Sequence, residues 1–258
     1  PRDTGGELPH PSALAVTAQS RFGNAVRQLC NVIGIALANR VRTVYLPGFW
    51  WIRKGSHELE CGLRLVNMPH LHPGEEPLLV AGRFFDVGDL TGLAPGQLSC
   101  HEAVRLVAGI LGVDRGGTPL EDEHLVIHVR AGDIFSAKRV HPNYGQPPLA
   151  FYERILASRA WKRATLVAED EGSPIWRALI DAATGKCATD VRVGNPLRED
   201  IEFLLRARSI AVGHGTFCRG IAAISRNLRE VHSFERSFDP WGTPGLNLVR
   251  WVDVLGAY

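Results

Sequence analysis

A histidine, an arginine and an aspartate stand together at the end of an apolar run near the middle of the chain. Within residues 125–135 (LVIHVRAGDIF), the β-branched residues indicate a strand covered on both faces, which His128, Arg130 and Asp133 interrupt or follow. Because ligands of open α/β sheets lie outside the carboxyl ends of the strands, these side chains would lie where a ligand binds. A guanidinium suits the oxygens of a phosphate. The alternative is an ion pair between Arg130 and Asp133 that holds the strand end.

Two further loops place glycines between a predicted strand and a predicted helix. One spans residues 20–24 (SRFGN) and the other spans residues 213–217 (GHGTF). Because glycine lets a backbone approach closely and a helix N-terminus favours an anion, both loops fit a phosphate cradle. In the alternative interpretation, Asn24 and Thr216 are ordinary helix N-caps. A third stretch, residues 141–152 (HPNYGQPPLAFY), fits either a rigid aromatic loop beside the site or a proline-rich entry to a helix.

The elements that must position these loops alternate between strand and helix. Alternation of this kind is typical of parallel sheets with right-handed crossovers. We expect an α/β fold with two Rossmann-like halves, residues 1–115 and 116–258, and a ligand cleft between them. In the first half the predicted elements are strand 13–17, helix 25–39, strands 43–46, 63–66 and 78–81, and helix 101–111. In the second half they are strands 124–130, 164–168, 189–193, 209–213 and 229–232, and helices 148–159, 174–183, 198–207 and 216–225.

The composition narrows the class of protein. With 258 residues and 45% apolar content, the chain can bury a proper core. The net charge of +2 gives no strong basic field, so we expect no nucleic-acid partner. No apolar run reaches the roughly 18 residues of a membrane span, so we expect none in this chain. We expect a cytoplasmic location, with the lumen of the secretory pathway as the alternative if a signal or anchor is removed.

Several motifs of known chemistry are absent from the sequence. It contains no GxGxxG dinucleotide fingerprint, no GxxxxGK[ST] phosphate loop and no GxSxG nucleophile elbow. The five cysteines are scattered without a CxxC pair, which argues against zinc or iron–sulfur ligation. No Asp-x-Asp follows a predicted strand, so we expect neither a metal nor another cofactor.

Taken in order, the three loops resemble the signatures of the GT-B fucosyltransferases. This superfamily includes the protein O-fucosyltransferases and the α1,2- and α1,6-fucosyltransferases. The stretch SRFGNAVRQLCNVIGIALA is similar in form to their G-x-[FG]-G-N turn before a helix. His128, Arg130 and Asp133 match their H-x-R-x-x-D motif, and GTFCRGIAAIS matches a small residue, Ser/Thr and an aromatic before a helix. The resemblance spans residues 20–225 and implies a GT-B-like fold.

The resemblance also implies an activity. It implies metal-independent, inverting transfer of fucose from GDP-fucose to a hydroxyl of a glycan or a protein. The C-terminal half would hold the nucleotide sugar, and the N-terminal half would hold the acceptor. Arg130 would grip the diphosphate and His128 would contact the nucleoside. The residues expected to hold the donor are Phe22, Gly23, Asn24, His128, Arg130, Gly215, Thr216 and Phe217.

The expected catalytic residues are Arg130 and Asn24 at the diphosphate, together with a base. Asp133 is the first candidate for the base, and His141 is the second. The α1,6-type enzymes have a second arginine where this chain has Ala131, so the linkage formed and the identity of the base stay open. Two alternatives remain. One is a non-catalytic protein that binds a nucleotide sugar, and the other is a transferase of a different hexose.

Overall fold

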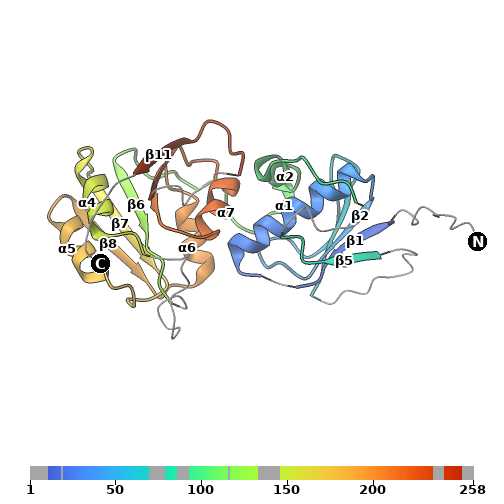
Figure 1. The fold of residues 1–258 in the computed structure, drawn as a ribbon, viewed down its shortest axis with the longest axis horizontal. Helices are drawn as coiled ribbons and strands as arrows, with labels where there is room; N and C mark the ends of the chain where they lie inside the picture. The colour runs from blue at the N-terminus through green and yellow to red at the C-terminus, as the bar shows by residue number, and fades with distance from the viewer. Residues whose placement is uncertain are drawn as a thin grey trace, which may run out of the picture. The chain divides into compact units, whose positions relative to one another are not determined.

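The computed structural model describes residues 11–18, 20–69, 79–85, 93–115, 117–132, 146–234 and 241–251. The chain divides into two compact units, residues 1–113 and 114–258, which we call unit 1 and unit 2 (Figure 1). The assignment of the two halves to acceptor and donor, and the cleft between them, stay predictions.

Unit 1 is built on a mainly parallel sheet. Within its described residues the sheet has five strands in the order β3-β4-β2-β1-β5, and β3 alone runs antiparallel to its neighbour. The strands are β1 (Ala13–Val16), β2 (Thr43–Leu46), β3 (Gly55–Glu58), β4 (Arg64–Asn67) and β5 (Leu79–Gly82). The helices are α1 (Phe22–Ala38) and α2 (Cys100–Leu106), followed by the short 3-10 helix η1 (Ala108–Ile110).

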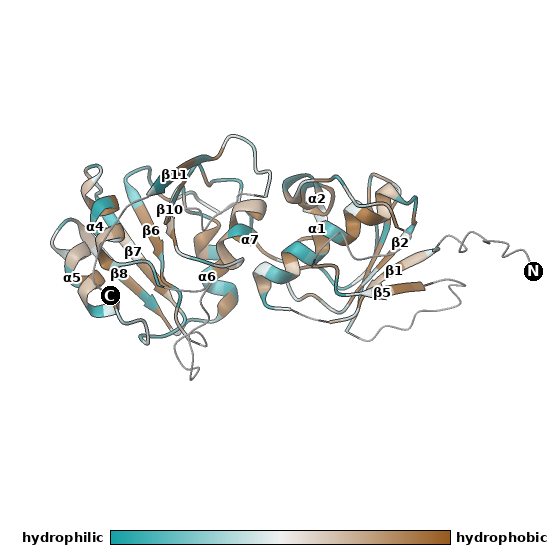
Figure 2. Cartoon of the chain, viewed as in Figure 1, coloured by the Kyte–Doolittle hydropathy of each residue, from teal (hydrophilic) through white to brown (hydrophobic). Residues whose placement is uncertain are grey.

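The long helix of unit 1 covers one face of this sheet. Helix α1 packs against β1 and β2, and α2 packs beside it. Val26, Leu29 and Ile33 recur at helical spacing and are fully buried, so they form the apolar stripe that the sheet receives. Figure 2 shows β5 in brown and α1 in alternating brown and teal, the pattern of an amphipathic helix on an apolar sheet.

Unit 2 holds a parallel sheet of six strands among its described residues. Its order is β11-β10-β9-β6-β7-β8, which is the order 3-2-1-4-5-6 of a doubly wound fold when strands are counted within the unit. The strands are β6 (His124–His128), β7 (Arg163–Ala168), β8 (Ala188–Val193), β9 (Ser209–Val212), β10 (Glu230–Phe234) and β11 (Asn247–Trp251). The helices are α4 (Leu149–Ala157), α5 (Trp176–Thr184), α6 (Leu197–Leu204) and α7 (Phe217–Ile224).

Helices cover both faces of this sheet. Leu125, Ile127 and Leu166 point to one face, where the buried side chains of α4 and α5 pack against them. Alternate residues point to the other face, where His124 meets Phe203 just before the end of α6 and His128 meets the first residue of α7. Strands buried on two faces explain the nearly continuous apolar runs in the sequence.

All the predicted elements exist and, apart from the helix 101–111, their ends differ by no more than three residues. Two strands were missed. Gly55–Glu58 is short and polar, with no apolar alternation to reveal it, and Asn247–Trp251 is an edge strand after a proline-rich stretch. The predicted helix 101–111 was too long, because it ends at Leu106 and the chain continues as a 3-10 turn.

Candidate functional site

The candidate donor site lies where the strand order of unit 2 reverses. Strands β6 and β9 are neighbours in the sheet, and their connections leave in opposite directions along it. A doubly wound sheet binds its ligands at such a point, outside the carboxyl ends of the strands. The segment 129–132 follows β6 and the segment 213–216 follows β9. The topology therefore brings two of the three loops singled out from the sequence to one place.

Arg130 and Gly215 meet at this edge. Gly215 has a φ of +119°, a conformation that side-chain-bearing residues rarely adopt, and a Cβ built there would collide with Nη1 of Arg130. Glycine is therefore required both for the turn and for the approach of the guanidinium. The guanidinium lies directly against the turn that leads into α7. A positive charge and a helix N-terminus thus face the same space, an arrangement that favours a phosphate.

His128 and Phe217 form the second contact between the two strand ends. Their ring centroids are 4.8 Å apart with an interplanar angle of 25°, so the rings are stacked. Burial, with a smaller contribution from the charge of Arg130, lowers the pKa of His128 to about 4. The imidazole is therefore neutral near pH 7, and Arg130 carries the positive charge of this part of the site. A flat, partly exposed pair of rings beside a turn that favours a phosphate suits a nucleoside.

Thr216 occupies the N-cap position of α7, as the alternative interpretation from the sequence expected. Its side chain makes no capping hydrogen bond to the helix. The neighbouring Cys218 is buried, and burial raises the pKa of its thiol although the charge of Arg130 opposes the shift. Cys218 therefore stays protonated and packs as a small apolar residue.

Sequence reasoning missed an acidic run beside these residues. Glu169 and Asp170 directly follow β7, and a Cβ at Gly132 would collide with the Glu169 carboxylate. The backbone N–H groups of Gly132 and Gly172 both donate to Oδ1 of Asp170, at 3.1 and 2.8 Å. Asp170 thus ties the loop after β6 to the loop after β7. The signal was available, since polar residues after a buried strand were the criterion used for the other loops.

Asp133 and His141, the two candidates for the catalytic base, lie outside the described residues. The same holds for the proposed ion pair between Arg130 and Asp133. Of the stretch 141–152, only residues from 146 onward are described. Pro147 lies against Gly213, where a Cβ would come within 3.1 Å of the proline ring, and α4 begins two residues later. This part of the stretch is thus both an entry to a helix and a neighbour of the 213–217 turn.

The first loop has a different structure from the one expected. Helix α1 begins at Phe22, its N-cap is Arg21, and no side chain caps it. The N-cap interpretation of Asn24 is therefore wrong, because Asn24 lies inside the first turn. Gly23 is also helical and buried rather than part of a loop. The backbone amides of Phe22, Gly23 and Asn24 form the N-terminal end of α1, where a helix favours an anion.

Aromatic rings surround this helix start. Phe22 lies 6.3 Å from Trp50 and 5.7 Å from Trp51, measured between ring centroids. Both tryptophans follow β2, which is the parallel neighbour of β1. The carboxyl ends of β1 and β2 therefore carry a cluster of rings in unit 1, where the carboxyl ends of β6 and β9 carry a guanidinium in unit 2.

Comparison with known proteins supports the fold on independent grounds. The sequence matches no protein-family model and no curated protein. The solved structure of the bacterial iron-containing dodecameric glycosyltransferase TibC from enterotoxigenic E. coli H10407 is similar with a TM-score of 0.50 at 12% identity, over 98% of this chain and 65% of that one. The fold is GT-B-like.

Two further structures align with TM-scores below 0.5. POFUT1 in complex with GDP aligns with a TM-score of 0.49 at 12% identity, over 95% of this chain and 99% of that one. The heptosyltransferase WaaC of E. coli with ADP aligns with a TM-score of 0.45 at 13% identity, over 95% and 96%. At such identities a structural likeness shows the fold alone. The prediction of a GT-B-like fold is confirmed by the two mainly parallel sheets together with the similarity to TibC.

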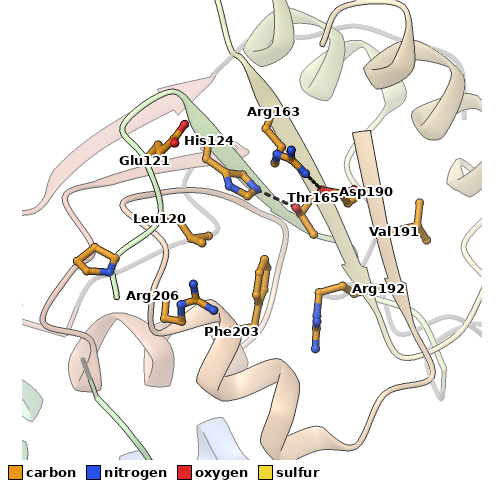
Figure 3. A pocket seen from close by; sticks show the side chains of 11 residues that line it. Leu120, Glu121, His124, Arg163, Thr165, Asp190, Val191, Arg192, Phe203 and Arg206 are labelled. Atoms are coloured by element: carbon orange, nitrogen blue, oxygen red, sulfur yellow. Dashed lines mark hydrogen bonds and ion pairs between the residues drawn. The ribbon is translucent and has the colours of Figure 1, made fainter. Parts of the chain in front are cut away.

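A recess of about 630 Å³ lies at the amino ends of β6 and β7, away from the segments 129–132 and 213–216 (Figure 3). Arg163 at its rim pairs with Asp190, and Arg192 pairs with Asp200 at 3.2 Å. Each of these arginines already has a carboxylate partner, and the recess lies near the amino ends of β6 and β7. It is therefore not the place where a doubly wound sheet binds its nucleotide.

Two properties of the described part of the chain bear on metals and membranes. No three side chains of His, Cys, Asp or Glu there form a group that could hold a metal ion. No helix among the same residues is both long and apolar enough to cross a membrane.

Proposed function

We propose that this protein is a glycosyltransferase that moves fucose from GDP-fucose to a hydroxyl of a glycan or a protein. The observation that carries the proposal is the meeting of Arg130 with the Gly215 turn at the strand-order reversal of unit 2. A cation at a helix N-terminus, with a stacked pair of rings beside it, matches the two chemical parts of a nucleoside diphosphate. The choice of fucose rests on the resemblance of the three loops to fucosyltransferases.

The chemistry requires stabilisation of a leaving group. As the bond from the anomeric carbon to the diphosphate breaks, negative charge builds on the phosphate oxygens and positive charge builds on the sugar. Arg130 and the backbone amides at the start of α7 would stabilise the departing GDP without a metal. His128 is neutral near pH 7, so it would serve the nucleoside as a hydrogen-bonding and stacking group rather than as a second cation.

The acceptor hydroxyl would attack from the face opposite the diphosphate and invert the anomeric centre. Its oxygen forms the new bond to the anomeric carbon, its proton passes to a base, and GDP leaves with the bonding electrons. Asp133 remains our first candidate for the base and His141 our second. Unit 2 would be the donor side and unit 1 the acceptor side, with Phe22, Gly23 and Asn24 at the start of α1 closing over the pyrophosphate.

The test is the release of GDP from GDP-fucose by the purified protein, with and without a mixed glycan panel. We expect release that the acceptor accelerates and that EDTA leaves unchanged. Activity that EDTA abolishes and Mg²⁺ or Mn²⁺ restores would contradict metal independence. Binding of GDP-fucose without release under any condition would favour a non-catalytic binding protein. Release from another hexose nucleotide, but not from GDP-fucose, would retain the transferase and correct the donor sugar.

A further inference from the structure

Three strand ends of unit 1 meet around one exposed tryptophan. Strands β1, β2 and β4 are parallel neighbours, so their carboxyl ends lie at the same edge of the sheet. Phe22 follows β1, the turn 49–52 follows β2, and Met68 follows β4, where its N–H donates to the Leu46 carbonyl. In an open α/β sheet, ligands bind outside the carboxyl ends of the strands.

A buried asparagine fixes the turn. Asn67, the last residue of β4, is fully buried, and its Oδ1 accepts the N–H of Phe49 at 2.8 Å. Its Nδ2 donates to the carbonyls of Phe49 and Ile52, both at 2.9 Å. A Cβ at Gly48, whose φ is +73°, would come within 2.8 Å of Pro69, so the chain before the turn also lies close against the end of β4. The turn is therefore held rigidly from two sides.

The turn exposes one residue and buries the others. Phe49, Trp51 and Ile52 are at most 2% exposed, whereas Trp50 between them is 41% exposed. Burial of an apolar side chain stabilises the fold. The other three side chains of the turn are buried and contribute in this way, whereas the exposed part of the Trp50 indole does not. The backbone on both sides of Trp50 is held by the hydrogen bonds of the buried asparagine and its ring lies 6.3 Å from that of Phe22, so the indole is presented at a defined place on the surface.

The size and surroundings of the exposed patch select its occupant. An indole exposed to this degree offers on the order of 100 Å², far below the roughly 800 Å² that each partner contributes to a standard protein interface. Met68 is the other large apolar side chain exposed in the described part of unit 1, at 44%. Arg53 and Lys54, next along the chain, are exposed donors. A flat apolar face with exposed hydrogen-bond donors three and four residues along the chain fits a sugar ring, whose C–H face is apolar and whose edge carries hydroxyls.

We propose that Trp50 is a stacking platform for a saccharide ring of the acceptor, held in place by Asn67 and backed by Phe22. This inference rests on the proposed function, because it assigns the acceptor to the saccharide class and to unit 1. Phe22 is the first residue of α1, so a sugar on Trp50 would lie beside the helix start that we assign to the pyrophosphate.

The experiment measures saccharide binding and nucleotide binding on the same samples. Methyl β-D-galactoside, methyl β-D-glucoside and N,N′-diacetylchitobiose are titrated by ligand-observed NMR, and GDP is titrated by calorimetry. Trp50→Leu keeps an apolar side chain but loses the flat ring, and Trp50→Phe restores a ring. Leu197→Ala, which changes a half-exposed apolar side chain of unit 2, is the matched control. Thermal melting verifies that each variant is folded.

We expect at least one saccharide to bind the native protein. We expect Trp50→Leu to weaken it by roughly two- to tenfold, the range for loss of one aromatic contact. Trp50→Phe should recover most of the saccharide affinity, and Leu197→Ala should leave it unchanged. The affinity for GDP should be the same in all these variants. GDP binding without binding of any saccharide, or saccharide binding equal in folded Trp50→Leu, would overturn the platform and leave the transferase standing. Saccharide binding that depends on Trp50, without nucleotide binding, would support the platform and overturn the transferase.

Discussion

The two units present the same backbone arrangement with different side chains. In each, a strand end leads to a helix whose first residue is a phenylalanine, Phe22 in unit 1 and Phe217 in unit 2. A neighbouring parallel strand then sends side chains against that helix start. In unit 1 these are tryptophan rings, and in unit 2 they are a histidine ring and the guanidinium of Arg130.

Under the proposed function, this difference assigns one substrate to each unit. The edge of unit 2 joins a positive charge to a helix N-terminus, which suits an anion. The edge of unit 1 offers rings, of which Trp50 is partly exposed to water, and this suits a neutral ring with an apolar face. The proposed division into donor and acceptor sides rests on this difference in side-chain chemistry.

The largest effect is expected at Arg130. Replacing it with alanine removes the charge that stabilises the departing diphosphate, and loss of one such contact typically costs about 10²–10³ in rate. We therefore expect Arg130→Ala to reduce transfer by about that factor while saccharide binding to unit 1 persists. Steady-state transfer assays and saccharide titration of the same variant measure both. If Arg130→Ala lost transfer and saccharide binding to the same extent, the assignment of one substrate to each unit would be contradicted.

The second effect concerns the stability of unit 1. Asn67→Ala leaves the N–H of Phe49 and carbonyls of the turn without their buried partner, and each such group costs about 1–3 kcal/mol. We expect a loss of about 2–4 kcal/mol in the free energy of unfolding, together with weaker saccharide binding. Denaturant unfolding monitored by tryptophan fluorescence gives the first quantity. Unaltered stability would show that the asparagine does not hold the turn.

Thr216 tests the edge of unit 2 more finely. Its side chain makes no capping bond to α7, so Thr216→Val should leave the helix intact. A hydrogen bond to a charged phosphate contributes about 1.5–3 kcal/mol, which corresponds to roughly ten- to a hundredfold in affinity. We expect calorimetry to show GDP binding weakened within that range. An unchanged dissociation constant would remove Thr216 from the donor site.

The smallest effect is a dependence of stability on pH. The pKa of His128 is about 4 in the folded protein and about 6.5 in an unfolded chain, so the unfolded state binds more protons between these values. The stabilisation from neutral His128 is complete above about pH 6.5 and is lost as the pH falls toward 4. We expect His128 to contribute on the order of 1 kcal/mol to the free energy of unfolding, because its ring is partly exposed.

The measurement for this prediction is the free energy of unfolding from pH 4 to pH 7. His128→Phe keeps a ring against Phe217 but cannot titrate. The free energy of unfolding of this variant should therefore depend less steeply on pH than that of the native protein. Part should remain, since burial also lowers the pKa of His124 and of His232. If the free energy of unfolding depends on pH equally in the variant and in the native protein, the lowered pKa of His128 would be contradicted.

The sequence was most informative where one local pattern dominates. The apolar run before His128 and the helical spacing of Val26, Leu29 and Ile33 both predicted the elements that the structure has. Local patterns failed where tertiary packing determines the conformation of a residue. The glycine of residues 20–24 predicted a turn, but Gly23 lies in the first turn of α1 and is buried.

The site was predictable in its residue types but not in its pairings. Nothing local indicates that β6 and β9 are neighbours, so the contacts of Arg130 with Gly215 and of His128 with Phe217 could not be derived from spacing. The run GFWWI is apolar throughout, and only the packing around Asn67 determines that Trp50 is its exposed member.

The central claim is that Arg130 serves a diphosphate ligand rather than the fold, and Arg130→Lys tests it most directly. Lysine keeps the charge but loses the planar fork that contacts two phosphate oxygens. Calorimetric titration of GDP, with thermal melting of the same sample, should show a folded variant of nearly native stability whose GDP affinity falls by about tenfold or more. A sharply lowered melting temperature, with GDP affinity of the folded fraction unchanged, would contradict the account.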